Sequence, residues 1–256
     1  MTDVRELSEN DTAMKFESWY LTDKGRRRES NQDSCLINRE LRLFVVADGM
    51  GGHSGGEVAS SMAVETVEEM MLQPGAMKKS PRELVQECYE EASRRIFDKA
   101  ATERPELIGM GTTMVMAHLR GKHLYVGNVG DSRCYLFKKP NLWQITEDHS
   151  LINEQMRAGL SEEQVLQFVG RNVITRSVGY ERDVYPDIIE REVSPGEIFL
   201  LCSDGLSSLV PDQRISEILN QNPPDKAVKA CVEQALANGG DDNVTVMLLH
   251  FLEDET

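Results

Sequence analysis

Apolar residues follow two different spacings along this chain, and each spacing predicts one kind of element. Between residues 81 and 100, apolar side chains recur at every fourth position, from Leu84 through Cys88 and Ala92 to Ile96. This spacing places them on one face of an amphipathic helix. The same reasoning predicts helices over 55–72, 151–158, 161–168, 211–220 and 225–238.

Short apolar runs bounded by glycine, proline or polar turns make up most of the remaining chain. They predict strands over 15–22, 33–38, 41–47, 111–119, 123–129, 132–138, 142–146, 185–192, 197–203 and 243–251. Several gaps between them are far shorter than the roughly twelve residues that a parallel crossover needs, so the sheets are expected to be antiparallel. The runs LFVVA, IFLLC and VTVMLL are apolar at consecutive positions, which indicates burial on both faces. The predicted fold is α+β, a four-layer α/β/β/α sandwich of two antiparallel sheets flanked by helix pairs.

No low-complexity linker, internal repeat or abrupt change of composition interrupts the chain between residues 14 and 252. The full length of 256 residues is enough for one large domain with a sizeable core. We therefore expect a single domain over 14–252. The polar ends, 1–13 and 253–256, are expected to be flexible tails.

The net charge of −15 limits the partners that the chain can bind. Nucleic acids and anionic membranes need a basic surface, and the chain supplies only one basic stretch, Lys24-Gly25-Arg26-Arg27-Arg28. The N-terminus lacks the apolar stretch of a secretory signal, and no run reaches the ~20 apolar residues that cross a bilayer. The five cysteines form no CxxC pair, which favours reduced core thiols. We expect a cytoplasmic monomer.

Aspartates stand at the ends of several predicted strands, next to glycine. They are Asp48 in LFVVADGMGG, Asp131 in NVGDSR, Asp204 in IFLLCSDG, and the pair Asp241 and Asp242 in GGDDNVTV. Buried strands converge in a core, so their ends can bring these carboxylates to one rim, where they would repel one another without cations. Oxygen ligands select hard ions such as Mg²⁺ and Mn²⁺, and the histidines show no HxH or HExxH spacing typical of zinc. The chain is therefore predicted to be a metal-dependent enzyme that acts on phosphate.

Taken together and in this order, the motifs resemble the signature set of the protein phosphatase 2C family, in its bacterial variety. The matching segments are Arg28-Glu29-Ser30-Asn31-Gln32-Asp33, Asp48-Gly49-Met50-Gly51-Gly52-His53, Gly130-Asp131-Ser132-Arg133, Ile174-Thr175-Arg176-Ser177-Val178-Gly179, Ser203-Asp204-Gly205 and Asp242-Asn243-x-Thr245-Val246. The resemblance covers about residues 16–250 and implies an α/β/β/α sandwich. Each motif alone is weak, because Asp48-Gly49 is also a common hairpin turn and Asp131 can simply cap a turn.

The resemblance implies that two divalent ions, Mn²⁺ or Mg²⁺, bind per active site, with a third, looser ion in bacterial relatives. The implied ligands are five carboxylates and one backbone carbonyl: Asp33, Asp48, Gly49, Asp131, Asp204 and Asp242. Asp48 would bridge the two ions, Asp33 would act through water, and Asp131 would share the third ion with Asp204. Carboxylates at the ends of apolar strands need such partners, since burying an unpaired charge is costly.

The resemblance also implies that Arg28 binds the substrate phosphate, for which a guanidinium fork is suited. The general acid is left open. Animal members place a histidine where this chain has Met50, and His53 is either its substitute, protonating the leaving group, or an exposed loop histidine. Residues 150–180 would form a flap beside the catalytic cleft.

Two further positions, Gln32 and Ser208, and one segment depart from the family pattern. Gln32 replaces a glutamate that many members carry before Asp33, which could weaken the binding of water around the metals. Ser208 stands where many members have an aspartate, which puts the third ion in question. Phe168-Val169-Gly170-Arg171-Asn172 departs from a His-Pro pattern in the flap, so substrate preference is expected to differ.

The expected function is hydrolysis of phosphoserine and phosphothreonine in proteins, by direct attack of a water molecule that the two metals activate. A cognate serine/threonine kinase is an expected partner. Two other functions are weighed against this one. The same fold with a silent site could act as a regulator or binding module, although the key aspartates are all present. A nuclease or phosphodiesterase would need a basic track, against which the charge of −15 argues.

Overall fold

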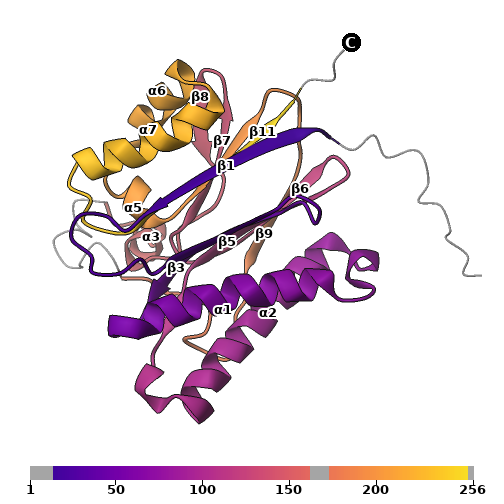
Figure 1. The fold of residues 1–256 in the computed structure, drawn as a ribbon, viewed down its shortest axis with the longest axis vertical. Helices are drawn as coiled ribbons and strands as arrows, with labels where there is room; N and C mark the ends of the chain where they lie inside the picture. Colours follow the sequence, from indigo (N-terminus) through magenta and orange to yellow (C-terminus); the bar gives the residue numbers. More distant parts are fainter. Residues whose placement is uncertain (1–13, 162–172, 253–256) are drawn as a thin grey trace, which may run out of the picture.

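The computed structural model of the chain describes residues 14–161 and 173–252, except for the side chains of residues 52–54. Two antiparallel sheets lie face to face, and helices cover both outer faces (Figure 1). The predicted four-layer α/β/β/α sandwich is confirmed. No helix in the described part of the chain is long and apolar enough to span a membrane.

The first sheet has the strand order β1–β11–β10–β7–β8. Its strands are Phe16–Asp23 (β1), Arg133–Lys138 (β7), Asn141–Gln144 (β8), Ile198–Cys202 (β10) and Val244–Phe251 (β11). The helices on its outer face are Asp212–Gln221 (α6) and Pro224–Ala237 (α7), whose apolar faces share one core with outward side chains of β10 and β11. A short helix, Asp204–Ser207 (α5), begins directly after β10.

The second sheet has the strand order β2–β3–β5–β6–β9. Its strands are Asp33–Asn38 (β2), Leu43–Met50 (β3), Met114–Arg120 (β5), His123–Val129 (β6) and Asp187–Glu192 (β9), and the two-residue strand Gly111–Thr112 (β4) pairs with the end of β3. The helices on its outer face are Gly52–Leu72 (α1) and Pro81–Asp98 (α2). Their apolar stripes, including Val67, Leu84 and Cys88, share one core with the outward side chains of β3 and β5.

Side chains from both sheets fill the space between them. Phe44 of β3 contacts Phe16 of β1 edge to face at 5.4 Å between ring centroids, and Phe199 contacts Phe251 in the same way at 5.7 Å. All five residues of β10 are buried, as the consecutive apolar positions of IFLLC predicted. All five cysteines are free, and four of them are buried, which confirms the interpretation as core thiols.

The structure differs from the sequence-based elements in a few places. The single strand expected over 111–119 is divided at Thr113 into β4 and β5. Both pieces pair with β3 in one register, but opposite Thr113 the Asp48 amide bonds to the Thr113 hydroxyl. Helix α2 ends at Asp98 and continues as a π-helical turn, Lys99–Glu103; single 3₁₀ turns cover Ala76–Lys78 and Pro105–Leu107. The helix expected over 151–158 is present as Leu151–Arg157 (α3). The helix expected over 161–168 and both expected tails lie outside the described residues.

Candidate active site

Strand pairing and strand ends bring the predicted aspartates to one end of the sandwich. Asp33 opens β2 and pairs directly with Asp48 of β3 in the antiparallel register. Asp131 follows β6 in the turn to β7. Asp204 opens α5 after β10, and Asp242 precedes β11, the neighbour of β10. Residues more than 200 positions apart in the chain therefore meet at one rim, as the positions at strand ends predicted.

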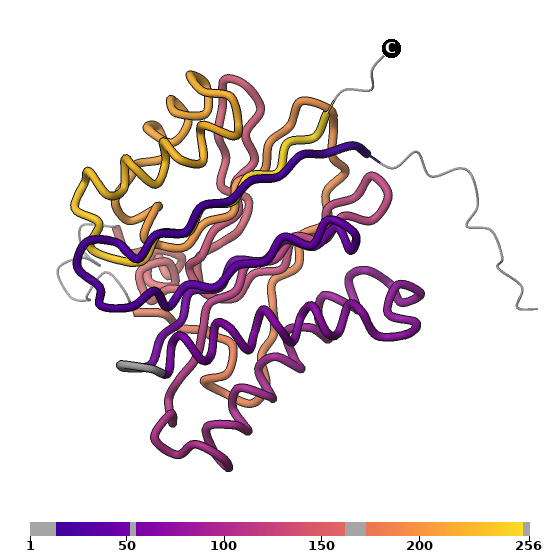
Figure 2. Tube along the Cα trace, in the orientation of Figure 1, coloured from indigo at the N-terminus to yellow at the C-terminus, as the bar shows by residue number. Residues whose placement is uncertain are grey.

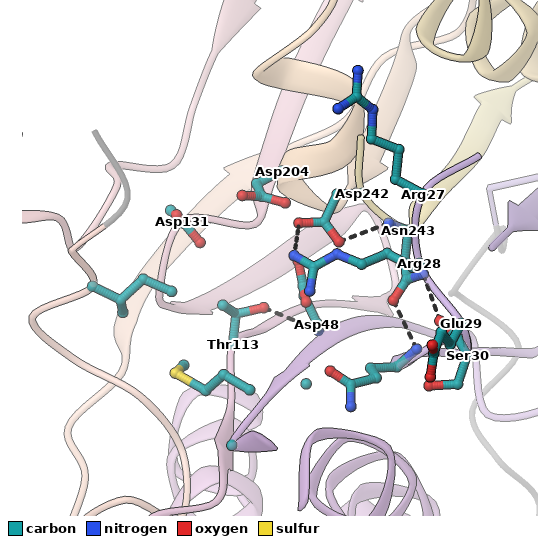
Figure 3. Close-up of a pocket in the computed structure, with 15 residues that line it drawn as sticks. Arg27, Arg28, Glu29, Ser30, Asp48, Thr113, Asp131, Asp204, Asp242 and Asn243 are labelled. Atoms are coloured by element: carbon teal, nitrogen blue, oxygen red, sulfur yellow. Dashed lines mark hydrogen bonds and ion pairs between the residues drawn. The ribbon is translucent and has the colours of Figure 1, made fainter. Parts of the chain in front are cut away.

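A cavity of about 560 Å³ lies at this rim and contains four of these carboxylates, on Asp48, Asp131, Asp204 and Asp242. Figure 3 shows them facing a common space, with the guanidinium of Arg28 beside Asp242. Asp33 does not line the cavity. Its Oδ2 accepts hydrogen bonds from Ser203 Oγ and Thr245 Oγ1, both at 2.7 Å.

The backbone of Asp48 is held on both sides by two threonines. The Asp48 amide donates to Thr113 Oγ1 at 3.1 Å, and the Asp48 carbonyl accepts from the Thr112 hydroxyl and the Thr113 amide, both at 2.8 Å. The Thr113 hydroxyl is also 2.7 Å from Ser132 Oγ in the turn that carries Asp131. These bonds fix where the Asp48 carboxylate enters the cavity.

Arg28 lies on a loop, residues 24–32, that a single buried asparagine ties to the start of β11. Asn243 donates from Nδ2 to the carbonyls of Lys24 and Ser30, at 2.7 and 2.9 Å, and its Oδ1 accepts from the Gln32 amide at 2.8 Å. Gly25 has a φ of +79°, and a Cβ there would lie 2.1 Å from the Asp242 carbonyl, so only glycine allows the loop to approach this closely. The loop and the strand end therefore behave as one unit.

Arg28 and Asp242 form an ion pair inside the cavity. The guanidinium Nη2 donates to Asp242 Oδ2 at 2.7 Å, and this bond is the main cause that raises the pKa of Arg28. The side chain of Arg28 remains half exposed, at 51%. Its other N–H groups therefore stay accessible to a ligand that enters the cavity.

Burial and mutual repulsion raise the pKa values of the carboxyl groups in this cluster. Burial is the first cause for Asp48, whose pKa lies well above its usual range, and neighbouring Asp33 and Asp204 add to it. Burial raises the pKa of Asp131 to about 7, followed by repulsion from Asp204. Burial and then Asp242 raise the pKa of Asp204, opposed by a hydrogen bond with the Asp48 carboxyl. A cation bound beside such carboxyl groups would stabilise their ionised form and lower their pKa values.

The carboxylate oxygens of the site are the kind of ligand that binds a divalent cation, although they do not surround one common point. No three acidic, histidine or cysteine side chains within residues 14–161 and 173–252 are gathered as ligands of a single ion. Asp242 is held by Arg28, and Asp33 by Ser203 and Thr245. However, Oδ1 of Asp33 and Oδ1 of Asp204 are buried without a hydrogen-bond partner among the described residues. Such atoms are rare in folded proteins, and a cation would satisfy them.

Comparison with known proteins matches almost the whole chain to one family. A profile of the family described as protein phosphatase 2C matches residues 22–248. The chain is 35% identical over 237 residues to a serine/threonine phosphatase, stp, of Listeria innocua, a match that covers 90% of this chain and 94% of the relative. The chain belongs to the protein phosphatase 2C family.

Solved structures of other family members have the same fold. The serine/threonine phosphatase PstP/Ppp of Mycobacterium tuberculosis superimposes with a TM-score of 0.84 at 31% identity, covering 93% of this chain and 99% of that one. A structure of the catalytic domain of a phosphatase named PstP, in complex with two manganese ions, gives a TM-score of 0.82 at 32% identity, with coverage of 93% and 99%.

The structure brings most of the residues implied by the family motifs together. Those that line the cavity are Arg28, Asp48, Gly49, Asp131, Asp204 and Asp242. Asp33 lies close enough to raise the pKa of Asp48. The side chain of His53 lies outside what the structure describes, as does the departure from the family pattern at 168–172. Ser208 is exposed and does not line the cavity.

Other residues at the site were not singled out from the sequence. Thr113, Ser203 and Asn243 bind the carboxylates and loops of the cavity from elements far apart in the chain. His149 also supports the site, because its Nδ1 accepts from the Gly130 amide at 3.1 Å. Its Nε2 must then carry the proton and donates to Asp187 at 3.1 Å, which makes His149 a support of the turn before Asp131.

Proposed function

We propose that this chain hydrolyses phosphoserine and phosphothreonine in proteins by direct attack of water on phosphorus, with the help of divalent metal ions. The observation that carries the proposal is the cavity in which four aspartates face Arg28. The enzyme class, a protein-serine/threonine phosphatase, is confirmed by the family match and by the names of the relatives. Phosphoproteins are accordingly the expected substrates.

The carboxylates of Asp48, Asp204 and Asp242, with Asp33 behind them and the Gly49 carbonyl beside them, would hold two ions of Mn²⁺ or Mg²⁺. Bound there, the ions would supply positive charge that lowers the pKa of water and offsets the charge of the phosphoryl group. The two manganese ions of the PstP structure support this number. Asp131 and Asp204 would bind a third ion. Ser208 is exposed and would not be one of its ligands.

Arg28 would bind the phosphoryl oxygens of the substrate. Its guanidinium is oriented by the 2.7 Å bond to Asp242, and the Asn243 contacts fix the loop that carries it. A planar guanidinium can donate two parallel hydrogen bonds to a phosphoryl group and keeps its charge at any physiological pH. The same contacts would stabilise the charge that spreads over the phosphoryl oxygens in the transition state.

The nucleophile in this proposal is water rather than a side chain. Among the described residues that line the cavity there is no cysteine and no histidine. The hydroxyl of Thr113 is engaged by the Asp48 amide and by Ser132. No phosphoenzyme should therefore form. The serine or threonine oxygen that leaves needs a proton, for which His53 remains the proposed donor on its position in the sequence.

We further propose that residues 14–252 form one catalytic domain that acts as a monomer, and that a cognate kinase is among its substrates. Residues 150–180 would form a flap beside the cavity. Contacts at the base of this segment support the flap. The Leu151 amide donates to the Val173 carbonyl at 2.8 Å, and the Thr175 amide donates to the His149 carbonyl at 2.9 Å. Residues 149–151 and 173–175 are thus adjacent, and Ile174 lines the cavity.

The test is a panel of phosphoserine, phosphothreonine and phosphotyrosine peptides assayed with Mn²⁺, with Mg²⁺ and with a chelator. We expect turnover of the first two peptides only with metal, and no phosphoprotein after an acid quench. Asp242→Asn should lower kcat/KM at least about 100-fold, since even the loss of a group that only orients a metal ligand costs about 10–100-fold. Its neighbour Asp241 is exposed and outside the cavity, so Asp241→Asn is the matched control and should keep the rate.

Two results would contradict the proposal. A covalent phosphoprotein trapped in acid would require a side-chain nucleophile. Folded protein that turns over none of the peptides in the presence of metal would favour the alternative of a silent regulator with the same fold.

A further inference from the structure

A groove leads away from the catalytic cavity toward α2. Met50 and Ile174 line both the catalytic cavity and a second hollow of about 490 Å³, whose wall is the segment 174–185. Residues 183–185 in turn line both this hollow and a third one of about 550 Å³ on the surface of α2. We call the second and third hollows together the lateral groove. Through these shared residues the catalytic cavity and the two hollows follow one another toward α2.

The wall of the lateral groove is anchored on two sides. Ser93 of α2 accepts a hydrogen bond from the Gly179 amide at 2.9 Å and donates to the Glu181 carbonyl at 2.7 Å. On the other side, Val178 exchanges two backbone hydrogen bonds with Thr112 of β4, at 2.8 and 2.9 Å. Figure 2 shows this stretch, in orange, running beside α2 before it enters β9. The groove is therefore held in place by the same strands that position Asp48.

Unpaired negative charge follows the lateral groove. Glu90, Glu181 and Asp183 are exposed, and none of them forms an ion pair with a residue in the described part of the chain. The basic side chains that line the groove are already engaged by carboxylates: Lys79 by Glu87, Arg94 by Glu91, and Arg176 by Asp187. Two aromatic side chains, Tyr180 and Tyr185, are 61% and 70% exposed at the same place. Carboxylates and tyrosine rings together attract lysine and, above all, arginine.

We propose that the lateral groove binds the polypeptide segment next to the phosphorylated residue of a substrate and favours segments that carry lysine or arginine. This inference rests on the proposed function. A phosphorylated residue held at Arg28 must let its neighbours leave the cavity along the surface, and the groove begins at the cavity wall, at Met50 and Ile174. The unpaired carboxylates then select the charge of those neighbours. The groove does not touch the phosphate itself.

The test compares three phosphothreonine peptides of equal length. One carries lysines before the phosphothreonine, one carries them after it, and one carries glutamates on both sides. We expect kcat/KM for one of the lysine peptides to exceed that for the glutamate peptide at least about fivefold, mainly through KM, since a few exposed ion pairs contribute that much. The ratio should fall as salt is added. The preferred lysine peptide gives the direction in which the substrate chain runs.

Charge-reversal variants tie the preference to the groove. Asp183→Lys and Glu90→Lys, both at exposed positions, should abolish or invert it, while turnover of p-nitrophenyl phosphate stays unchanged because that substrate has no neighbours to bind. Glu233→Lys reverses an exposed carboxylate on α7, in the opposite helix layer, and should keep the preference.

The outcomes separate this inference from the proposed function. Equal turnover of all three peptides by the wild type, or a preference that survives both reversals, would contradict the proposed role of the lateral groove. Neither result would contradict the proposed phosphatase activity. Absence of turnover with every peptide would instead contradict the phosphatase itself, and the groove with it.

Discussion

Asn243 connects the two loops of the active site through one buried amide. All of its side-chain hydrogen bonds cross from the start of β11 to the loop that carries Arg28, and only 3% of the residue is exposed. Without it, two carbonyls and one amide of that loop would lose their partners. An unsatisfied buried polar group costs about 1–3 kcal/mol, so one side chain supports both the stability of the rim and the position of Arg28.

We expect Asn243→Ala to lower the free energy of unfolding by about 1–3 kcal/mol and to raise KM for p-nitrophenyl phosphate, because the Arg28 loop is released. Urea unfolding and steady-state kinetics measure the two effects. Asn222→Ala, which removes one bond to the Ile218 carbonyl at the end of α6, is the control and should leave KM unchanged. An unchanged KM in Asn243→Ala would show that the amide does not position Arg28.

Asp131 makes the stability of the metal-free protein depend on pH. Burial raises its pKa to about 7 in the fold, against an ordinary value of 3.8. Between these values the folded protein retains a proton that the unfolded chain has lost, so stability falls as pH rises from about 4 to about 7. Urea unfolding in chelator should show this fall, and Asp131→Asn should make it shallower. Parallel curves for both proteins would contradict the assignment.

The carboxylates could be predicted from the sequence because each lies at one end of a predicted strand. The residues that hold them could not. Thr113, Ser203 and Asn243 find their partners 65, 170 and 211 or more positions away, and no local spacing encodes those contacts. The motif Asp242-Asn243 points to the family, but the role of Asn243 becomes evident only from its three hydrogen bonds.

At the scale of elements, β3 and α1 meet through a pair of glycines at the edge of the cavity. A Cβ on Gly56 would lie 2.6 Å from the Gly49 carbonyl, and one on Gly49 would lie 2.0 Å from the Gly56 carbonyl. No other residue allows the helix to begin this close to the strand that carries Asp48. The close contact therefore sets the position of the Gly49 carbonyl, the predicted metal ligand.

Gly56→Ala should destabilise the protein by about 1–3 kcal/mol through overpacking, even though alanine favours a helix by roughly 1 kcal/mol over glycine. It should also lower kcat/KM, because the end of β3 must move. Thermal unfolding and turnover of p-nitrophenyl phosphate measure these effects. Ser61→Ala, on the same helix, tests for a general effect of alanine and should change kcat/KM little. A fully active, equally stable Gly56→Ala would refute the contact.

Most elements could be predicted from periodicity, since the apolar stripes and runs are long. The exception at the site is the strand expected over 111–119, where apolar and β-branched residues continue through Thr113. The register with β3 continues through Thr113, and the break arises because the Asp48 amide bonds to the Thr113 hydroxyl there. A tertiary contact thus overrides the local pattern.

At the scale of the whole molecule, the antiparallel topology decides where charge collects. Antiparallel pairing places the end of one strand beside the start of its neighbour, so β2, β3, β6, β10 and β11 all present acidic residues at one rim. The layered fold was predictable from the short gaps, whereas the ion pair between Arg28 and Asp242 was not, because 214 positions separate the two residues. Electrostatic repulsion among the carboxylates at this rim destabilises the metal-free fold, and bound cations would offset that repulsion.

Mn²⁺ should therefore raise the melting temperature in a concentration-dependent manner. An ion at a hundred times its Kd adds about 2.7 kcal/mol to the free energy of unfolding when it binds only the folded state. Differential scanning fluorimetry with increasing Mn²⁺ tests this. Asp48→Asn should lose most of the shift, and Asp241→Asn should keep it. Equal melting temperatures with Mn²⁺ and with chelator would favour the silent regulator.

The most direct test of the central claim is anomalous diffraction from crystals grown with manganese. The account predicts two manganese peaks in the cavity, in contact with carboxylate oxygens of Asp48, Asp204 and Asp242. Active protein whose crystals show no manganese at these oxygens, or show the aspartates turned away from one another, would contradict it.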